Sequence, residues 1–386
     1  MFGEHRNLDL YIQSLNHLSV YDGRYDEIYP MHGSFPVKPD LIPKLTAGAQ
    51  EKKEIDWLKE LSSRITINGY MQGGYEYADK GGQTTSTFNF KRAIFWGRAR
   101  ITDRWSFMFM NNFALPKGVL EFWTDYRVTN NKALTVRIGQ FQHPFSLESP
   151  LTPTMLELVD ITSQAVTNLA NGNEPLLGPN FGRDQGIMLL GDLFNDHFHY
   201  ELAVMNGQGI NTTDGNSDKD IILKLEYRPS KEFRIVASGQ KGRGHAVNET
   251  PVAWNPTIHK GDDYRRDRVS FGGEAKIPTQ LGRKSTSGGI CLRSEFLAGK
   301  DGDVGSRGAY LTGSVALGKG IDLIGSADYY DRNTSESGWQ QTNITGGLQY
   351  WFYRKCRLQL QYTHSFCGEL LGDDYNRVQA QVQVAF

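Results

Sequence analysis

The chain has 386 residues, of which 39% are hydrophobic, and its 42 lysines and arginines are balanced by 43 aspartates and glutamates. This balance excludes a global field that would draw the protein to nucleic acid or to an anionic membrane surface. The longest purely apolar stretches, at 94–96 and 107–110, are far shorter than the roughly 20 residues that a spanning helix needs, which excludes a helical membrane protein.

Residues 1–62 differ in composition from the rest of the chain. They are rich in Tyr, His, Pro and charged residues, contain no alternating run, and predict one short helix around 47–63. We interpret them as a separate periplasmic or plug-like segment. The first 30 residues lack the regions of a secretory signal, so we expect the sequence to be that of a mature chain whose signal has been removed.

From residue 63 onward, segments of about ten residues alternate between apolar and polar side chains, which is typical of transmembrane barrel strands. This alternation also explains the mean hydropathy of -0.49. The fold class that we predict is an all-β, 16-stranded antiparallel transmembrane β-barrel over 63–386. Its strands are expected at 63–78, 87–101, 104–114, 118–128, 133–142, 184–193, 197–206, 219–228, 232–241, 264–277, 287–298, 308–317, 321–331, 340–353, 356–366 and 375–386.

The links between the predicted strands alternate in length. The links after strands 2, 4, 6, 8, 12 and 14 are short, and only the one after strand 10, PTQLGRKST, is longer. Long links follow strands 5, 7 and 9, at 143–183, 207–218 and 242–263, and links of intermediate length follow strands 11, 13 and 15. A transmembrane barrel has short periplasmic turns and longer extracellular loops, whereas a soluble sandwich has no reason for this alternation.

The last predicted strand separates two kinds of side chain. Val378, Ala380, Val382, Val384 and Phe386 share one face, and Arg377, Gln379, Gln381 and Gln383 share the other. One face suits lipid and the other suits water. We expect the barrel-assembly machinery to recognise this strand, although an edge strand of a soluble β-protein could show the same pattern.

Three motifs carry a family resemblance: RIGQFQHPFSLES at 137–149, GRDQGIMLLGD at 182–192 and YELAVMNGQGIN at 200–211. In these motifs the chain resembles the phosphate-selective porin O and P family. The resemblance implies a 16-stranded, usually trimeric channel whose best-known members favour phosphate through arginines and lysines in the lumen. Those ligands lie outside the matching motifs, so the resemblance does not place them in this sequence.

If the apolar face of each strand meets lipid, the opposite face lines the lumen. That face carries more basic than acidic residues, and a guanidinium binds phosphate or carboxylate through two parallel hydrogen bonds. Alternatively, these side chains pair with acids on neighbouring strands and only satisfy a polar wall. The candidate pore-lining and anion-binding residues are Arg92, Arg98, Arg100, Arg127, Arg137, Lys224, Arg234, Arg268 and Arg293.

The link at 143–183 is too long for a structureless connection in a compact fold. We interpret it as a constriction loop that folds into the lumen. Its segment from Thr152 and Pro153 onward predicts a short helix, with an acid early in the helix where the dipole favours it. The loop contains acids but neither Lys nor Arg up to residue 182, so its acids oppose the basic wall if they face the pore. The candidate constriction residues are Glu148, Glu157 and Asp160.

Other chemical motifs are weak. His197 and His199 share one face of a strand but lack a nearby third metal ligand. The segment 214–220, DGNSDKD, alternates oxygen ligands but lacks the glycine and the distal glutamate of a standard calcium loop. Cys291, Cys356 and Cys367 form no regular framework. We therefore expect no metal centre and no cofactor.

Catalytic signatures are missing from the sequence: it contains no GxSxG, no HExxH and no glycine-rich phosphate loop. His364 and Ser365 are adjacent on a strand, so their side chains point to opposite faces. The sequence therefore indicates that the protein is not an enzyme.

The function that we expect is passive diffusion of small hydrophilic solutes through the outer membrane of a Gram-negative bacterium, with a mild preference for phosphate-like anions. The expected partners are these solutes, outer-membrane lipid with lipopolysaccharide, and two further copies of the chain in a homotrimer. The alternative is a structural barrel in an export or envelope assembly, with residues 1–62 as a plug or partner-binding arm.

Overall fold

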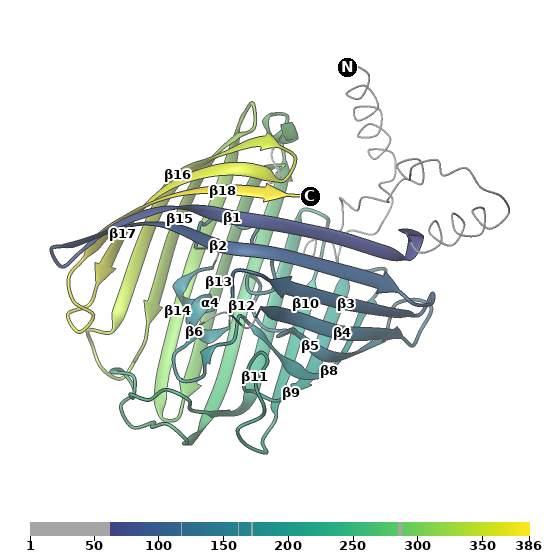
Figure 1. The fold of residues 1–386 in the computed structure, drawn as a ribbon, viewed down its shortest axis with the longest axis horizontal. Coiled ribbons are helices and arrows are strands. Elements are labelled where there is room, and N and C mark those ends of the chain that lie inside the picture. Colours follow the sequence, from purple (N-terminus) through teal and green to yellow (C-terminus); the bar gives the residue numbers. More distant parts are fainter. Residues whose placement is uncertain (1–61, 117, 161, 171–172, 285–287) are drawn as a thin grey trace, which may run out of the picture.

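The structure is a computed structural model that describes residues 62–116, 118–160, 162–170, 173–284 and 288–386. In these residues, sixteen antiparallel strands form one closed barrel (Figure 1). The barrel strands are β1 (Ile65–Lys80), β2 (Gln83–Arg100), β3 (Trp105–Asn112), β4 (Val119–Arg127), β5 (Thr135–Gln142), β8 (Arg183–Leu193), β9 (Phe198–Met205), β10 (Asp220–Tyr227), β11 (Phe233–His245), β12 (Asp263–Pro278), β13 (Gly289–Asp301), β14 (Val304–Gly318), β15 (Ile321–Asp331), β16 (Gln340–Tyr353), β17 (Cys356–Cys367) and β18 (Tyr375–Ala385).

Each barrel strand pairs with its neighbours in chain order, except at two places that define the topology. Strand β1 pairs with β18, from Tyr70 opposite Ala385 to Lys80 opposite Tyr375, and this pairing closes the barrel. Strand β5 pairs directly with β8, although residues 143–182 separate them. That intervening chain contains helix α4 (Gln164–Leu169) and the two-stranded sheet of β6 (Asn173–Glu174) and β7 (Gly178–Pro179).

The predicted fold class is confirmed, and the strand ends differ only slightly. The largest differences lie at the extracellular ends: β2 begins at Gln83 instead of 87, β11 reaches His245 instead of 241, and β14 begins at Val304 instead of 308. The extension of β2 is polar throughout, and those of β11 and β14 contain glycines and an arginine, so the alternation of apolar and polar residues is interrupted in all three. Backbone pairing with the next strand continues through them, as at Arg243 opposite Arg265, because the ladder does not depend on the side chains.

Alternating side chains give the wall two different faces. On β18 the side chain of Val384 is 50% exposed on the outside, whereas Gln383 is fully buried on the inside. The ring of Phe386 lies 5.6 Å from the ring of Phe95 on the outer face, and its N–H donates to the carbonyl oxygen of Gly69 at 3.0 Å. The last strand is therefore oriented with its glutamines toward the lumen and its valines outward.

The wall is not equally high all round. The six adjacent strands β3, β4, β5, β8, β9 and β10 have 8, 9, 8, 11, 8 and 8 residues, and we call them the low wall. The β1–β2 hairpin, by contrast, has strands of 16 and 18 residues and turns at Gly81 and Gly82, both with positive φ. Figure 1 shows the short arrows of β3–β5 beside this long hairpin.

The helical parts of the described chain are short, and none of them is long and apolar enough to cross a membrane. Residues 1–61, which hold most of the predicted N-terminal segment, lie outside the described residues.

One glycine on the inner face gives helix α4 the room to approach the wall. A Cβ added to Gly299 of β13 would lie 2.8 Å from Cδ2 of Leu169 in α4 and 3.0 Å from Cδ of Arg268. Both distances are shorter than van der Waals contact, so a larger side chain at this position must displace the helix or the arginine.

We predict that Gly299→Val lowers the free energy of unfolding by about 1–3 kcal/mol, the usual effect of overpacking, and speeds hydrogen exchange of the amides in 163–170. Urea titration and exchange measured by mass spectrometry check this. The matched control is Gly325→Val on β15, where an added Cβ meets nothing within 4 Å. Equal exchange of 163–170 in the two variants would contradict the prediction.

Candidate functional site

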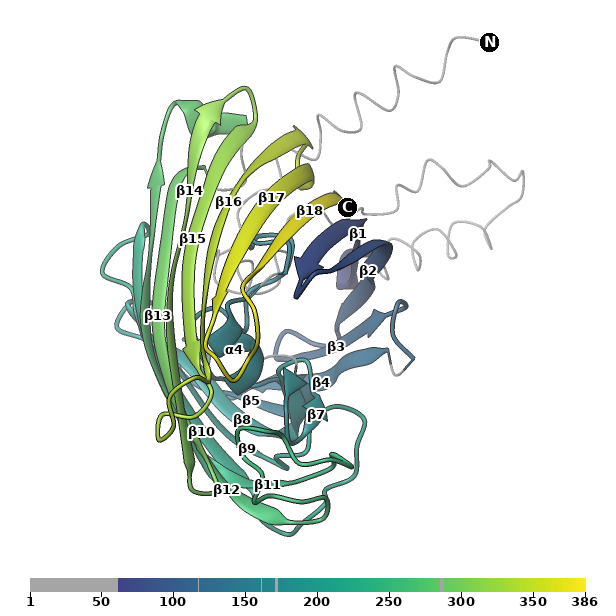
Figure 2. The same ribbon diagram turned by 90° about the vertical axis from the view of Figure 1, so that its left-hand side faces the viewer.

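The described residues of 143–182 lie inside the barrel, and we call this segment the inner loop. Figure 2 shows α4 enclosed by the strands. The helix contacts β13, β14 and β15, and Ser163 caps its start by accepting a hydrogen bond from the N–H of Val166. Since β15 stands opposite β5 in the order of the barrel strands, the inner loop crosses the lumen from one side to the other.

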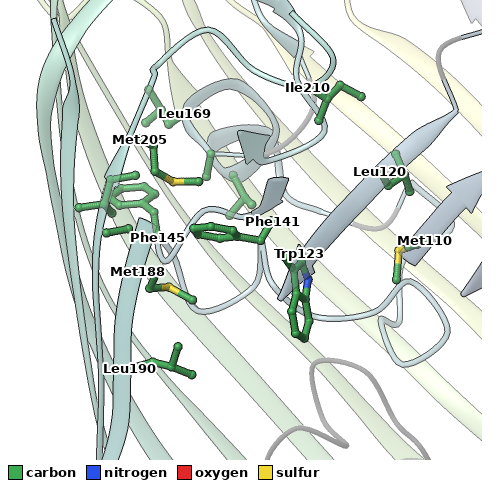
Figure 3. Packing of buried hydrophobic residues seen from close by; sticks show 14 of the residues in the cluster. Met110, Leu120, Trp123, Phe141, Phe145, Leu169, Met188, Leu190, Met205 and Ile210 are labelled. Carbon is green, nitrogen blue, oxygen red and sulfur yellow. The ribbon is translucent and has the colours of Figure 1, made fainter. Parts of the chain in front are cut away.

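Apolar side chains hold the inner loop against the low wall (Figure 3). Phe145 and Leu169 of the loop belong to one buried cluster with Phe141 of β5, Met188 of β8 and Met205 of β9. Burial of a large apolar side chain contributes roughly 1.5–3 kcal/mol. The cluster also explains why β8 is apolar on both faces, because one face packs inside the barrel and the other is exposed outside.

Amide side chains of β17 bind the backbone of the inner loop. Nε2 of Gln359 and Nε2 of Gln361 donate to the carbonyl oxygen of Glu157 at 2.9 and 2.6 Å. Oε1 of Gln361 accepts from the N–H of Val159 at 2.9 Å. A loop buried inside a barrel has backbone groups that need partners, and these glutamines supply them.

The helix predicted from Thr152 is wrong in its position: turns and bends occupy the chain up to residue 160, and α4 begins only at Gln164. The carbonyl oxygens that a helix would use internally accept hydrogen bonds from the wall instead. Nη2 of Arg357 donates to the carbonyl oxygens of Pro153 and Leu156, at 3.1 and 2.8 Å. Contacts with the wall therefore override the local helix signal.

Carboxylates of β13 and of the loop complete the attachment. Glu295 accepts from the N–H of Leu147 and from the hydroxyl of Ser146, both at 2.9 Å. Arg293, also on β13, lies between Glu157 of the loop and Glu274 of β12, at 2.8 and 2.7 Å. Both carboxylates are buried, so each depends on the arginine for charge compensation.

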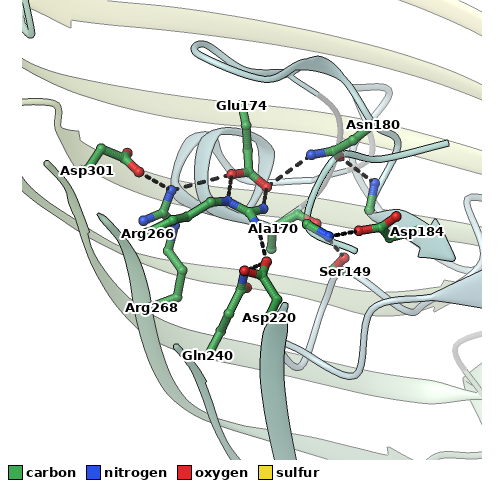
Figure 4. Close-up of polar contacts among 12 residues, drawn as sticks. Ser149, Ala170, Glu174, Asn180, Asp184, Asp220, Gln240, Arg266, Arg268 and Asp301 are labelled. Atoms are coloured by element: carbon green, nitrogen blue, oxygen red, sulfur yellow. Dashed lines mark hydrogen bonds and ion pairs between the residues drawn. The ribbon is translucent and has the colours of Figure 1, made fainter. Parts of the chain in front are cut away.

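The end of the inner loop is fixed by the buried ionic cluster that Figure 4 shows. Glu174 forms ion pairs with Arg266 and Arg268 of β12. Arg266 also pairs with Asp220 of β10, and Arg268 pairs with Asp301 of β13 at 2.7 Å. Burial alone would raise the pKa of Glu174, but the two guanidinium groups outweigh it and hold this pKa below its ordinary value.

Five of the nine predicted anion-binding residues lie beside carboxylates. Three of them, Arg137, Lys224 and Arg293, stand directly opposite an acid in the strand register, and so does Arg234. The structure therefore pairs these five basic residues with acids, four of them across neighbouring strands and Arg293 with the inner loop as well. The distances are 2.8 Å for Arg137–Asp125, 3.1 Å for Lys224–Glu201, 3.1 Å for Arg234–Glu274, 2.7 Å for Arg268–Asp301 and 2.8 Å for Arg293–Glu157.

The other four predicted residues all lie on β2 and β4. Arg92 donates to Oε1 of Gln72 at 2.8 Å, and Arg98 donates to the hydroxyl of Ser106 at 3.3 Å. Arg100 and Arg127 end their strands at the periplasmic side and are exposed. Within the described residues, no ion pair joins Arg92, Arg100 or Arg127 to an acid.

The three predicted constriction acids lie inside the barrel, where wall residues and the loop itself contact them. Glu157 pairs with Arg293, whereas Asp160 pairs with Arg377 and lies 3.3 Å from Lys91. Burial would raise the pKa of Asp160, but the two basic groups outweigh it and lower this pKa. Glu148 accepts from the N–H of Ser163 at 2.9 Å, and burial raises its pKa to about 8.

Sequence reasoning missed Lys91, which contacts the loop although Arg92 beside it was assigned to the lumen. The register of β1 with β2 shifts between Gln72 and Gly73, so that Gln72 stands opposite Arg92 and Gly73 opposite Phe90. This irregularity lets both basic residues face inward. The sequence of one strand does not reveal such an irregularity, because it depends on the pairing with the neighbouring strand.

The weaker motifs have ordinary partners. Nδ1 of His199 lies 2.8 Å from Asp192, and Nδ1 of His197 lies 2.7 Å from the carbonyl oxygen of Arg228. In the segment 214–220, Asp214 forms an ion pair with Lys219. Over the part of the chain that the structure describes, no three metal-binding side chains come together.

Comparison with known proteins agrees with this architecture. The sequence model of the phosphate-selective porin O and P family matches residues 65–232. No curated protein sequence matches the chain. Among solved structures, the anion-selective porin from Comamonas acidovorans is similar at a TM-score of 0.58 with 16% identity, covering 83% of this chain and 99% of that one.

Two further structures show the same fold. Pseudomonas putida OprB is similar at a TM-score of 0.59 with 10% identity, covering 88% of this chain and 97% of that one. OmpT of Vibrio cholerae, in a trimer form, is similar at 0.58 with 11% identity, covering 84% and 100%. At these identities the likeness shows the fold alone.

A closed barrel of sixteen strands with an apolar outside, a polar inside and a loop folded across it is the architecture of a porin of the Gram-negative outer membrane. With the match at 65–232, the resemblance of the sequence is confirmed. The chain is therefore an outer-membrane porin, and its residues 65–232 match the phosphate-selective porin O and P family.

We predict that Arg293 and Glu157 are energetically coupled. Arg293→Met leaves two buried carboxylates without this arginine and should cost about 3–5 kcal/mol of unfolding free energy. In a double-mutant cycle with Glu157→Gln, measured by urea unfolding, the coupling energy should reach about 0.5–3 kcal/mol. The control cycle pairs Arg293→Met with Asp125→Asn, whose partner is Arg137. That cycle should be additive, and additivity in both would refute the coupling.

Proposed function

We propose that the protein lets small hydrophilic solutes diffuse passively through the outer membrane, with a mild preference for anions. The single observation that carries the anion preference is the set of basic residues on β2 and β4, Arg92, Arg100 and Arg127, which form no ion pair with a carboxylate in the described residues. Five other candidate residues already have acids beside them. The preference therefore depends on a few positions and not on the average charge of the wall.

Solute passage past the inner loop fits the same picture. The loop narrows the lumen, and its acids Glu157 and Asp160 are compensated by basic side chains of the wall. A compensated constriction does not repel anions as free carboxylates would, because opposite charges in contact present little net field. The remaining basic residues can then set the sign of the selectivity through the ring-charge mechanism.

We predict that Arg100→Glu combined with Arg127→Glu shifts the reversal potential in a KCl gradient toward cation preference. The reason is that both side chains are exposed at the periplasmic end of the lumen wall. The measurement is made on the full chain in planar bilayers. The matched control is Lys241→Glu, which makes the same charge change at an exposed position on the outer face of β11.

An unchanged potential in the double variant would remove these arginines from the ion pathway. Phosphate added to the wild-type channel tests the finer preference, because a phosphate site reduces chloride current as it fills. A protein that conducts nothing in any salt would instead favour a structural barrel and contradict the channel itself.

We also propose that the chain forms a homotrimer through its low wall. Strands of eight residues span about 26 Å, and at a tilt of about 40° they reach only about 20 Å along the barrel axis, less than the apolar band of about 25 Å. A groove of about 500 Å³ on this wall combines Phe122 and Ile138 with the polar Gln140, Gln185 and Asn211. A second copy of the chain would cover this short and partly polar wall better than lipid does.

We predict that Ile138→Gln converts trimers to monomers on native gels and in crosslinking. Ile138 lines the groove and is 51% exposed, so an amide there weakens an apolar contact between copies. The matched control is Leu323→Gln on β15, outside the low wall, where the side chain is 50% exposed. Loss of trimers in both variants, or in neither, would contradict the assignment of this face.

A further inference from the structure

A polar cavity of about 320 Å³ lies between the inner loop and the inner faces of β15–β18, near their extracellular ends. On one side it is lined by Leu158, Asp160, Thr162, Gln164, Thr167 and Asn168 of the loop, and on the other by wall residues such as Ser326, Asn343 and Thr363. None of the nine predicted anion-binding residues lines this cavity. It is therefore a separate feature of the solute pathway.

The lining consists mainly of neutral side chains that both donate and accept hydrogen bonds. Six of its residues carry amides and six carry hydroxyls: Gln164, Asn168, Gln341, Asn343, Gln361, Gln379, Thr162, Thr167, Ser326, Thr345, Thr363 and Tyr375. An amide offers one acceptor oxygen and two donor hydrogens, and a hydroxyl offers both functions at one atom. The cavity is thus suited to a ligand that can also do both.

The four charged residues of the lining balance one another. Asp160 and Arg377 form an ion pair. Asp328 accepts from the N–H of Gln164 at 2.8 Å, and Arg332 donates to Oε1 of Gln341 at 3.2 Å. Two positive and two negative groups give no net charge, so the cavity has no overall attraction for a free anion or a free cation.

Three buried polar atoms of the lining have no hydrogen-bond partner in the protein. They are Oε1 of Gln164, Oδ1 of Asp328 and Nε of Arg377. Buried polar atoms are nearly always hydrogen-bonded in folded proteins, so these atoms call for a partner in the cavity. Two of them accept and one donates. Phosphate at neutral pH can both accept and donate, but the balanced charges of the lining give its negative charge no net attraction, whereas an ammonium group donates but cannot accept from the arginine.

We propose that this cavity binds a neutral polyhydroxylated solute of the sugar type on its way through the channel. Each hydroxyl of such a solute both donates and accepts, which matches the amides, the hydroxyls and the three unpartnered atoms. Binding exchanges hydrogen bonds with water for hydrogen bonds with the wall, so it is weak, and a weak site lets the solute leave again. The proposal rests on the proposed channel function.

The test uses the full chain in planar bilayers, with maltose as the probe of a neutral polyol. Maltose should reduce the ion current reversibly and saturably. In Asn343→Leu the concentration for half block should rise by about tenfold, relative to the variant's own sugar-free current, because Asn343 lines the cavity and its side chain accepts a hydrogen bond from Gln341 of the same strand. The control is Asn376→Leu on β18, whose side chain bonds Tyr362 and His364 and does not line the cavity.

Thr345→Val serves as a second variant, because it removes only a hydroxyl that pairs with Thr363 at 2.9 Å and keeps the shape of the side chain. This variant should also weaken the block by maltose, and it keeps the test possible if Asn343→Leu does not assemble. Block by glycine or by phosphate, but not by maltose, would overturn the proposal in favour of a zwitterion or an anion. A conducting channel that maltose does not block overturns it as well, whereas absence of conductance without sugar contradicts the channel function instead.

Discussion

The whole interior depends on one constraint: a loop of about 40 residues inside a closed barrel must find partners for its backbone. Three chemically different sectors of the wall hold this loop in place, and two of them supply partners for its backbone. The low wall offers apolar side chains, β12 and β13 offer ionic groups, and β17 offers amides such as Gln359 and Gln361. Each sector is a run of inward-facing residues on neighbouring strands, so the same alternation that makes the outer face apolar also prepares the inner face for the loop.

This constraint changes how the basic residues of the lumen are understood. An excess of arginine on the inner face first suggests a ladder for anions. The register instead places several of them opposite acids, and Arg293 compensates a loop carboxylate and a wall carboxylate together. Such arginines stabilise the position of the loop, and the neighbouring acids cancel most of their positive electric field in the lumen. Selectivity is then left to the fewer basic residues of β2 and β4.

The sequence was sufficient for the barrel but only partly for the site. Regular alternation in β17 and β18 made their inner and outer faces readable, and the lengths of the links gave the order of turns and loops. The pairing of Glu157 with Arg293 was not readable, because the two residues are far apart in the chain and nothing local links them. The irregularity beside Lys91 and the true start of α4 were also hidden, since both are set by contacts with other strands.

The closure of β1 on β18 has a consequence for how the molecule assembles. Gln72 donates to Gln383 across that seam, between residues 311 positions apart, and Gln383 also donates to the carbonyl oxygen of Thr154 in the inner loop. The loop therefore cannot complete its contacts until the last strands have been made and placed. Contacts of such long range form late in folding. Closing the barrel and completing the contacts of the loop therefore depend on the same strand, so an error in the pairing of β18 disturbs the wall and the interior together.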